Sequence, residues 1–270
     1  MTAAILSALT IAGSDSGGGA GIQADLKTFA AYGVHGLSVV TALTAQNTRG
    51  VRAVHVPDGG FLRAQLDAVF EDFRIGVVKL GMLANASVIH CVAEVLERHT
   101  PPHVVLDPVM VASSGARLLQ SDALEALRTR LVPLASILTP NLPEAELLLA
   151  LHGADTIDEG NADGALDRLL ALGPQAVLLK GGHMPGGALL HDRFGAGTTR
   201  VQFSHARLPL DGHGTGCTLA AAIAAGLCLG APLVAACQDA TDYVHGALQH
   251  AYFPGGAPLA VLDHFWRLRR

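Results

Sequence analysis

The sequence predicts a three-layer α/β/α protein with a mostly parallel central sheet and an antiparallel hairpin at its edge. Short β-rich runs alternate with amphipathic helical stretches along the 270 residues. The β-rich runs are continuously apolar, which is typical of parallel strands that helices cover on both faces. Half of the residues are hydrophobic and only 15% are charged, so the chain can bury an extensive core.

The expected strands and helices follow one another in chain order. Buried strands are expected at Leu9–Ala12, Leu37–Leu43, Val77–Leu80, Val104–Leu106, Ile137–Leu138 and Ala176–Leu179. Helices between them are indicated by apolar residues three or four positions apart: Ile22, Leu26 and Phe29; Leu62, Leu66, Val69 and Phe73; Val88, Val92, Val95 and Leu96; and Leu124, Leu127 and Leu131, with Ser121 as the N-cap.

The alternation of strands and helices breaks once, before the C-terminal helices. Leu189–Phe194 and Arg200–Phe203 flank a Gly-Ala-Gly-Thr turn and are expected to form the edge hairpin. Helices are then expected at Cys217–Leu229, at Pro232–Gln249 with the proline in the first turn, and in a short segment ending at Trp266. No repeat or linker interrupts the pattern, so residues 1–270 are predicted to form a single domain.

Charge and apolar patterning exclude two classes of partner. The net charge is -5 and the one basic run, at Arg267, Arg269 and Arg270, is terminal, so no nucleic-acid surface is expected. The longest apolar run, Cys217–Leu229, is too short to span a membrane, and no signal peptide is visible at the start. The four cysteines lack CxxC spacing, which favours free thiols and a cytoplasmic protein.

The strongest local signal is the glycine-rich segment Asp211–Cys217, which precedes a helix-forming run. Gly214 and Gly216 allow the backbone to approach a ligand closely. The first N–H groups of the helix have no intrahelical partner and lie at the positive end of the helix dipole, so this turn is a candidate phosphate site. The alternative is a glycine-rich helix start that only packs against a strand.

Cys217 favours the functional interpretation of this turn. A thiol in the first helical turn is expected to have its thiolate stabilised by the dipole and by free amides. It is then placed to accept a proton from a substrate hydroxyl, or to orient that hydroxyl. Cys91, Cys228 and Cys237 lie in apolar helical patterns and are expected to act as small hydrophobic residues. The thirteen histidines show no zinc spacing, and His213 is expected to pack or hydrogen-bond rather than bind phosphate.

A set of motifs extends from about residue 9 to residue 226. They are the segment Leu9–Phe29 with its Gly-Ser-Asp-Ser-Gly-Gly-Gly-Ala-Gly turn, Thr41–Thr48, Lys79–Leu83, Leu106–Met110, Leu138–Ala145, Lys180–His183 and Asp211–Cys217. In this order they resemble the bifunctional hydroxymethylpyrimidine/phosphomethylpyrimidine kinases of thiamine biosynthesis, a branch of the ribokinase-like fold. One departure is visible, because Ser16-Gly17 stands where that family commonly has Pro-Ser.

The resemblance implies a substrate site for an aminopyrimidine. It makes Asp25 a partner of the pyrimidine and its hydroxymethyl group, although the pattern alone favours a solvated helix residue. Gln46 follows a strand end, and its amide offers the donor and acceptor that an aminopyrimidine edge requires. Met82 and Val109 are expected to supply apolar walls, or else to belong to the core.

The resemblance also implies ATP and Mg²⁺. Asn141 and Glu144 are expected to organise the metal, assisted by Asp107, although Asn141 could equally cap a helix that has Glu144 in its first turn. Lys180 is expected to reach the nucleotide phosphates, and Asp211 to shape the nucleotide side of the anion loop. The amides from Gly214 through Thr215 and Gly216 to Cys217 would hold the transferring phosphoryl group.

The function that the resemblance implies is two successive ATP-dependent phosphorylations, first of the hydroxymethylpyrimidine and then of its monophosphate. Fold relatives are often dimers, so a homodimer is expected. Two alternatives remain open: a pyridoxal or pyridoxine kinase of the same superfamily, and a binding domain that senses the pyrimidine phosphate without turnover.

Overall fold

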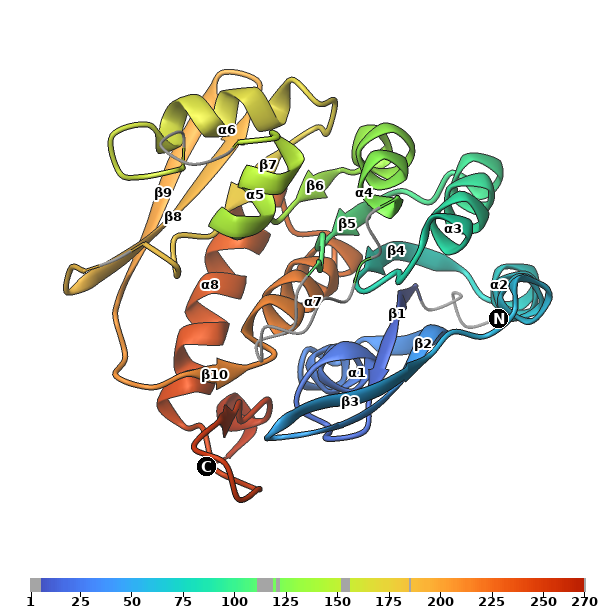
Figure 1. Ribbon diagram of the computed structural model, residues 1–270, viewed down its shortest axis with the longest axis horizontal. Helices are drawn as coiled ribbons and strands as arrows, with labels where there is room; N and C mark the ends of the chain where they lie inside the picture. The colour runs from blue at the N-terminus through green and yellow to red at the C-terminus, as the bar shows by residue number, and fades with distance from the viewer. Residues whose placement is uncertain (1–5, 111–118, 120–121, 152–155, 185, 270) are drawn as a thin grey trace.

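The computed structural model describes residues 6–110, 119, 122–151, 156–184 and 186–269. Its middle layer is a nine-stranded sheet in the order β3-β2-β1-β4-β5-β6-β7-β8-β9 (Figure 1). The strands are β1 Ser7–Asp15, β2 His35–Asn47, β3 Gly50–His55, β4 Ile75–Leu80, β5 Val104–Leu106, β6 Ile137–Leu138, β7 Val177–Leu179, β8 Leu189–Ala196 and β9 Thr199–Ala206.

The sheet is parallel from β2 through β7 and antiparallel at both edges. The β8–β9 hairpin confirms the predicted antiparallel edge. The β2–β3 hairpin at the opposite edge was not predicted, because β3 is a half-exposed edge strand that lacks a continuous apolar run. The fold class is therefore confirmed, with a second hairpin added.

Helices cover both faces of the sheet. On one face lie α2 (Gly59–Asp72), α3 (Ala86–His99), α4 (Ala123–Ala126), α5 (Leu142–Leu148) and α6 (Ala162–Leu170); on the other lie α1 (Gly21–Ala31), α7 (Thr215–Cys228) and α8 (Leu233–Gln249). Successive strand residues point to opposite faces: Val78 belongs to the first core and Val77 to the second. The chain therefore forms the expected three layers.

Three local expectations need correction. The helix expected around Leu127 is α4 followed by a π-helical turn at Leu127–Leu131 and a 3₁₀ turn at Val132–Leu134, and its predicted cap Ser121 lies outside the described residues. The short helix expected to end at Trp266 is wrong, because strand β11 (Ala260–Val261) and a turn occupy that segment and a 3₁₀ turn begins only at Trp266–Leu268. Pro232 is the N-cap of α8 rather than a first-turn residue.

A small parallel sheet joins the C-terminal segment to the body of the fold. Its strands are β10, Gly212–His213, and β11, Ala260–Val261. β10 leads directly into α7, an Ala-rich helix whose residues Leu219–Ala225 are almost completely buried. The carboxyl ends of the parallel strands and the start of α7 consequently face the same space, which is where α/β proteins bind their ligands.

Within the part of the chain that the structure describes, no helix is both long enough and apolar enough to cross a membrane.

Candidate active site

A cleft of about 1000 Å³ lies between the carboxyl ends of the strands and the start of α7. All but one of the predicted site residues line it: Gln46, Met82, Asp107, Val109, Asn141, Glu144, Lys180, Asp211, Gly214, Thr215, Gly216 and Cys217. The exception is Asp25. Motifs far apart in the sequence are thus brought to one cavity by the order of the strands.

The start of α7 forms a tight turn against the N-terminal glycine-rich segment. Gly214 is the N-cap, with a φ of 82°, in the left-handed region that favours glycine. A Cβ at this position would lie 2.0 Å from the carbonyl oxygen of Gly19. The first helical bond runs from the Thr218 N–H to the Gly214 carbonyl, so the N–H groups of Thr215, Gly216 and Cys217 have no intrahelical acceptor. The turn therefore has the backbone arrangement of an anion site.

Cys217 retains some exposed surface and lines the cleft. Its sulfur accepts a hydrogen bond from the Gly21 N–H, at the start of α1. Burial raises the pKa of the thiol to about 11, and the nearby Lys79 ammonium offsets only part of this effect. The expected ionised thiol is therefore wrong for the unliganded protein, because loss of solvent around the sulfur outweighs the favourable charges.

Asp25 lies behind the cleft wall rather than in solvent. Its side chain is fully buried, and Oδ2 accepts hydrogen bonds from Thr10 Oγ1 at 2.6 Å and Lys79 Nζ at 2.9 Å. The pattern-based expectation of a solvated helix residue is therefore wrong. Its other oxygen, Oδ1, is buried and has no hydrogen-bond partner among the described residues.

Lys79 is a site residue that the sequence reasoning missed. Its side chain is completely buried in β4. Burial opposes the charged form, but the adjacent carboxylates of Asp25 and Asp107 outweigh this and raise its pKa. A lysine in the centre of an otherwise apolar, doubly covered strand was the available signal, because a buried ammonium requires a charged partner.

Lys180 lies at the other side of the loop. Its Nζ donates to Asp107 Oδ1 at 2.9 Å and lies 3.8 Å from Glu144 Oε2. A Cβ on Gly216 would lie 3.1 Å from this Nζ, so the ammonium is packed under the start of α7. A second positive charge therefore adjoins the candidate anion site.

Asn141 and Glu144 form a capping box at the start of α5. Asn141 Oδ1 accepts from the Glu144 N–H at 2.9 Å, and Glu144 Oε2 accepts from the Asn141 N–H at 2.8 Å. The capping alternative is thus confirmed. Burial raises the pKa of Glu144 to about 7, against the lowering effect of Lys180.

The donor set around Glu144 is compatible with a hard cation. Asp107 and Glu144 supply carboxylate oxygens and Asn141 an amide oxygen, the ligand types that Mg²⁺ takes alongside water. Among the described residues, no group of three or more His, Cys, Asp or Glu side chains could enclose a metal ion by itself. The residues therefore fit a magnesium ion that keeps several waters or nucleotide oxygens.

Asp15 and His213 join the N-terminal turn to the anion loop. The Asp15 carboxylate accepts the N–H groups of Gly17, Gly19 and Ala20, and His213 Nε2 lies 2.9 Å from its Oδ2. Burial opposes ionisation of Asp15, but the bonds from His213 and these amides prevail and lower its pKa. The expectation that His213 acts as a hydrogen-bonding residue is confirmed.

The remaining predicted residues occupy the cleft walls. Met82 is buried and, with partly buried Val109, belongs to a small apolar cluster around Ala42. Asp211 is exposed at the cleft edge, and its carbonyl accepts the Ala260 N–H. The assigned roles of Met82, Val109 and Asp211 stay predictions.

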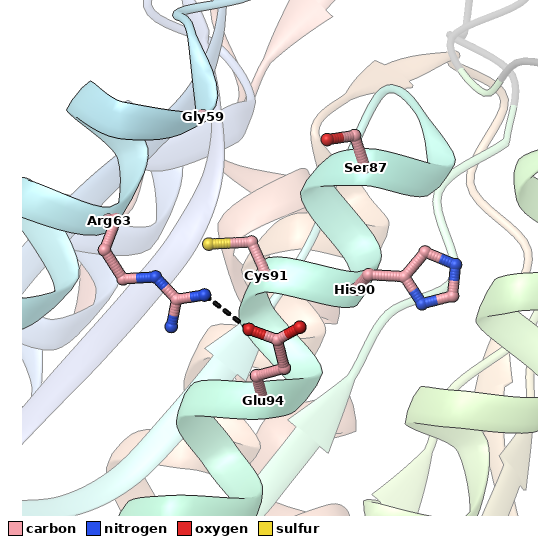
Figure 2. A pocket seen from close by; sticks show the side chains of 6 residues that line it. All are labelled: Gly59, Arg63, Ser87, His90, Cys91 and Glu94. Carbon is pink, nitrogen blue, oxygen red and sulfur yellow. Dashed lines mark hydrogen bonds and ion pairs between the residues drawn. The ribbon is translucent and has the colours of Figure 1, made fainter.

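A separate hollow of about 540 Å³ lies on the surface between α2 and α3. Figure 2 shows Arg63 of α2 paired with Glu94 of α3, with the sulfur of Cys91 beside them. Cys91 is partly buried and packs against the core, and Cys228 and Cys237 are buried, so all three pack as the small hydrophobic residues that were expected. This hollow shares no residue with the cleft at α7.

Comparison with known proteins identifies the family of the chain. Residues 15–260 match the family described as phosphomethylpyrimidine kinase. The chain belongs to the phosphomethylpyrimidine kinase family. A hydroxymethylpyrimidine/phosphomethylpyrimidine kinase from Rhizobium meliloti is 49% identical over 265 residues, covering 96% of this chain and 98% of the relative.

Two solved structures of this family and its neighbours share the fold. A phosphomethylpyrimidine kinase from Clostridium difficile matches with a TM-score of 0.79 at 40% identity, covering 90% of this chain and 99% of the relative. Bacillus subtilis pyridoxal kinase, solved as an ADP complex, matches with a TM-score of 0.87 at 32% identity, covering 98% of this chain and all of the relative. Both functional branches weighed from the sequence thus share this architecture.

Proposed function

We propose that this protein transfers the γ-phosphoryl group of ATP to the hydroxyl of 4-amino-5-hydroxymethyl-2-methylpyrimidine, and then transfers a second one to the resulting monophosphate. The observation that carries the proposal is the glycine-lined start of α7, where free N–H groups adjoin Cys217 and Lys180 within the cleft. Membership of the phosphomethylpyrimidine kinase family supports the same acceptor.

The acceptor heterocycle would lie between the N-terminal turn and the ends of β2 and β4. Gln46 would pair with the amino group and ring nitrogen, and Met82 and Val109 would contact the ring faces. The unpartnered Oδ1 of Asp25 would accept from the substrate after a small shift of the wall. These assignments place the hydroxymethyl group toward Cys217.

Catalysis would depend mainly on position and charge. The N–H groups of Thr215, Gly216 and Cys217 would neutralise the phosphoryl group in flight, as phosphoryl transfer requires. Because the thiol is protonated at neutral pH, Cys217 would orient the acceptor hydroxyl by hydrogen bonding. In a loose transition state the hydroxyl proton leaves late, so a strong base is not needed. The second acceptor is already an anionic phosphate and needs less help from the thiol.

ATP would bind at the outer half of the cleft. The ammonium of Lys180 would turn partly away from Asp107 and contact the phosphates of ATP. Asp211 would border the nucleotide. Support comes from the B. subtilis relative, which binds ADP. Asn141, Glu144 and Asp107 would hold Mg²⁺, which would supply charge neutralisation for the nucleotide phosphates.

The direct test is ADP release with three acceptors side by side: the hydroxymethylpyrimidine, its monophosphate and pyridoxal. The proposal expects turnover with the first two and much lower kcat/KM with pyridoxal. Turnover with pyridoxal alone would favour the pyridoxal kinase alternative, and binding without ADP release from any acceptor would favour the sensing domain.

The predicted homodimer stays a proposal. It is supported by the free outer edge of β3 and by Leu43 and Val54 near it, which are 47% and 44% exposed. Light scattering during size-exclusion chromatography should give twice the 27.8 kDa chain mass; the mass of a single chain would contradict it.

A further inference from the structure

The side-chain amide of Gln46 is held between two polar neighbours. In the structure its Oε1 lies 3.2 Å from the Oγ1 of Thr44, and its Nε2 lies 3.2 Å from His213 Nε2. A half-turn about the last side-chain bond exchanges these two amide atoms. Its backbone is fixed as well, because Ser16 Oγ accepts from the Gln46 N–H at 2.8 Å and donates to its carbonyl at 2.7 Å. What remains to be specified is which end of the amide faces which neighbour.

On one side, the proton of Thr44 is already engaged. Thr44 Oγ1 lies 2.9 Å from the carbonyl oxygen of Ser14, which can only accept. A hydroxyl has a single proton, so the oxygen that Thr44 turns toward Gln46 acts as an acceptor. It therefore requires the NH₂ end of the amide.

On the other side, His213 Nε2 must carry a proton. It lies 2.9 Å from Oδ2 of Asp15, an ionised carboxylate that only accepts. Burial disfavours the ionised form of Asp15, but the bonds from His213 and the turn amides outweigh this and lower its pKa. A protonated Nε2 next to an NH₂ group would set two donors against each other, so this side requires the amide oxygen.

We propose that Thr44 and His213 are specificity-determining residues that fix the Gln46 amide in the exchanged orientation, with its nitrogen toward Thr44 and its oxygen toward His213. The amide nitrogen then donates one N–H to Thr44, and the amide oxygen shares the Nε2–H of His213 with Asp15. One N–H and one oxygen lone pair are left for a ligand. The heterocycle thus meets a donor and an acceptor in a fixed order.

The order of donor and acceptor on the Gln46 amide discriminates between the two candidate acceptors. This inference rests on the proposed function. Next to the hydroxymethyl-bearing carbon, the aminopyrimidine presents an amino donor followed by a ring-nitrogen acceptor. Pyridoxal presents an aldehyde acceptor followed by a hydroxyl at the corresponding positions. An amide free to turn would serve both sequences of groups, whereas a fixed amide serves only one.

A ligand-free measurement tests the orientation directly. In protein labelled with ¹⁵N-glutamine and with methyl-labelled threonine, the Gln46 NH₂ protons should show a nuclear Overhauser effect to the Thr44 methyl group. Gln46→Glu identifies the resonance. Contacts of the NH₂ protons with the His213 ring instead would overturn the proposal, whether or not the protein is a kinase.

Calorimetric binding tests the consequence for specificity. Thr44→Val removes the hydroxyl at nearly constant shape and should weaken binding of the hydroxymethylpyrimidine about 5- to 10-fold while leaving pyridoxal unchanged or tighter. The matched control is Thr129→Val, an exposed threonine outside the cleft whose hydroxyl donates to the carbonyl of Glu125, and it should leave both affinities unchanged.

A double variant shows whether Thr44 acts through the amide. In the background of Gln46→Ala, Thr44→Val should cause no further loss of aminopyrimidine affinity. Multiplicative losses, or equal losses for both heterocycles, would contradict the inference. Failure of the wild-type protein to bind either heterocycle would count against the proposed function, while the amide orientation would still be decided by the resonance measurement.

Discussion

At the scale of single residues, the cleft combines groups that would be unfavourable alone. The Cys217 thiol is packed between the starts of α1 and α7, and its pKa is raised to about 11 by burial. It adjoins the ammonium of Lys79, which forms a buried ion pair with Asp25. A neutral thiol next to a fixed positive charge suits a group that orients a hydroxyl.

Replacing Cys217 by alanine should therefore affect the two transfers unequally. The first transfer needs the hydroxyl oriented and should lose about 100-fold or more in kcat. The second transfer, whose acceptor is a phosphate, should lose less than about 10-fold. Single-turnover ADP release with each acceptor measures both values, and equal losses would contradict the role given to the thiol.

The buried Lys79–Asp25 pair should be a strong determinant of stability. Lys79→Met leaves Asp25 without its counter-charge and should lower the free energy of unfolding by about 3–5 kcal/mol, as found when one member of a buried pair is removed. Adding Asp25→Asn should recover much of the loss. Urea unfolding measures both.

The matched control is the exposed pair Arg63–Glu94 on α2 and α3, where Arg63→Met should cost at most about 1 kcal/mol. Similar losses for Lys79→Met and Arg63→Met would show that Lys79 has no special dependence on its partner.

The sequence located residues of the cleft where a motif lies at the end of a strand, and the roles assigned to these residues stay predictions. Gln46, Asp107 and Lys180 all reach the cleft for that reason. Asp25 and Lys79 could not be placed in this way, because their environment depends on a contact between α1 and β4, which are 54 positions apart at these residues. The neutral state of Cys217 likewise depends on burial by distant segments.

At the scale of elements, the central feature is the junction of β10 and α7 with the N-terminal turn. Gly214 combines a positive φ with contact to the Gly19 backbone. The positive φ and the close backbone contact are separate constraints. A glycine at the other end of the same helix has the first without the second. Gly230, just beyond the end of α7, has a φ of 85°, and a Cβ added there would have no neighbouring atom within 4 Å.

Gly230→Ala should thus cost only the conformational penalty, about 1–2 kcal/mol, and leave turnover unchanged. Gly214→Ala places a Cβ 2.0 Å from a backbone oxygen, so the loop must shift and kcat should fall sharply in addition to the loss of stability. Urea unfolding and ADP release on both variants check this. Full activity in Gly214→Ala would show that the loop geometry is not required.

The order of strands and helices was largely predictable, because the central strands are continuously apolar and the helices have clear periodicity. The β2–β3 hairpin was missed because an edge strand with exposed side chains lacks that signal. The short helix expected to end at Trp266 was wrong because that segment holds β11, which pairs with the distant strand β10. Tertiary contacts decide the secondary structure of such short segments.

At the scale of the whole molecule, the C-terminal segment stabilises the active-site helix. His264 is 2% exposed, and its Nε2 lies 3.1 Å from the hydroxyl of Thr218, the residue after Cys217. The hydroxyl of Tyr243 on α8 donates to the His264 carbonyl at 2.6 Å. Burial, reinforced by Lys27, lowers the pKa of His264 to about 4.

This buried histidine should make stability fall in mild acid. The neutral form is favoured in the folded state, so its contribution is complete above the unfolded pKa of about 6.5 and is lost as pH falls toward about 4. Between pH 7.5 and pH 5 it should cost about 2 kcal/mol. Urea unfolding of wild type and His264→Gln at both pH values isolates this effect, and an equal pH dependence in the two proteins would contradict it.

The central claim is that the start of α7 holds the phosphoryl group during transfer. A crystal structure with ADP, Mg²⁺, aluminium fluoride and the hydroxymethylpyrimidine tests it most directly, because the fluoride complex occupies the place of the transferring group. We expect the aluminium centre to lie within hydrogen-bonding reach of the Thr215, Gly216 and Cys217 N–H groups, between the ADP and the substrate hydroxyl. A fluoride complex bound elsewhere in the cleft, with these N–H groups facing solvent, would contradict it.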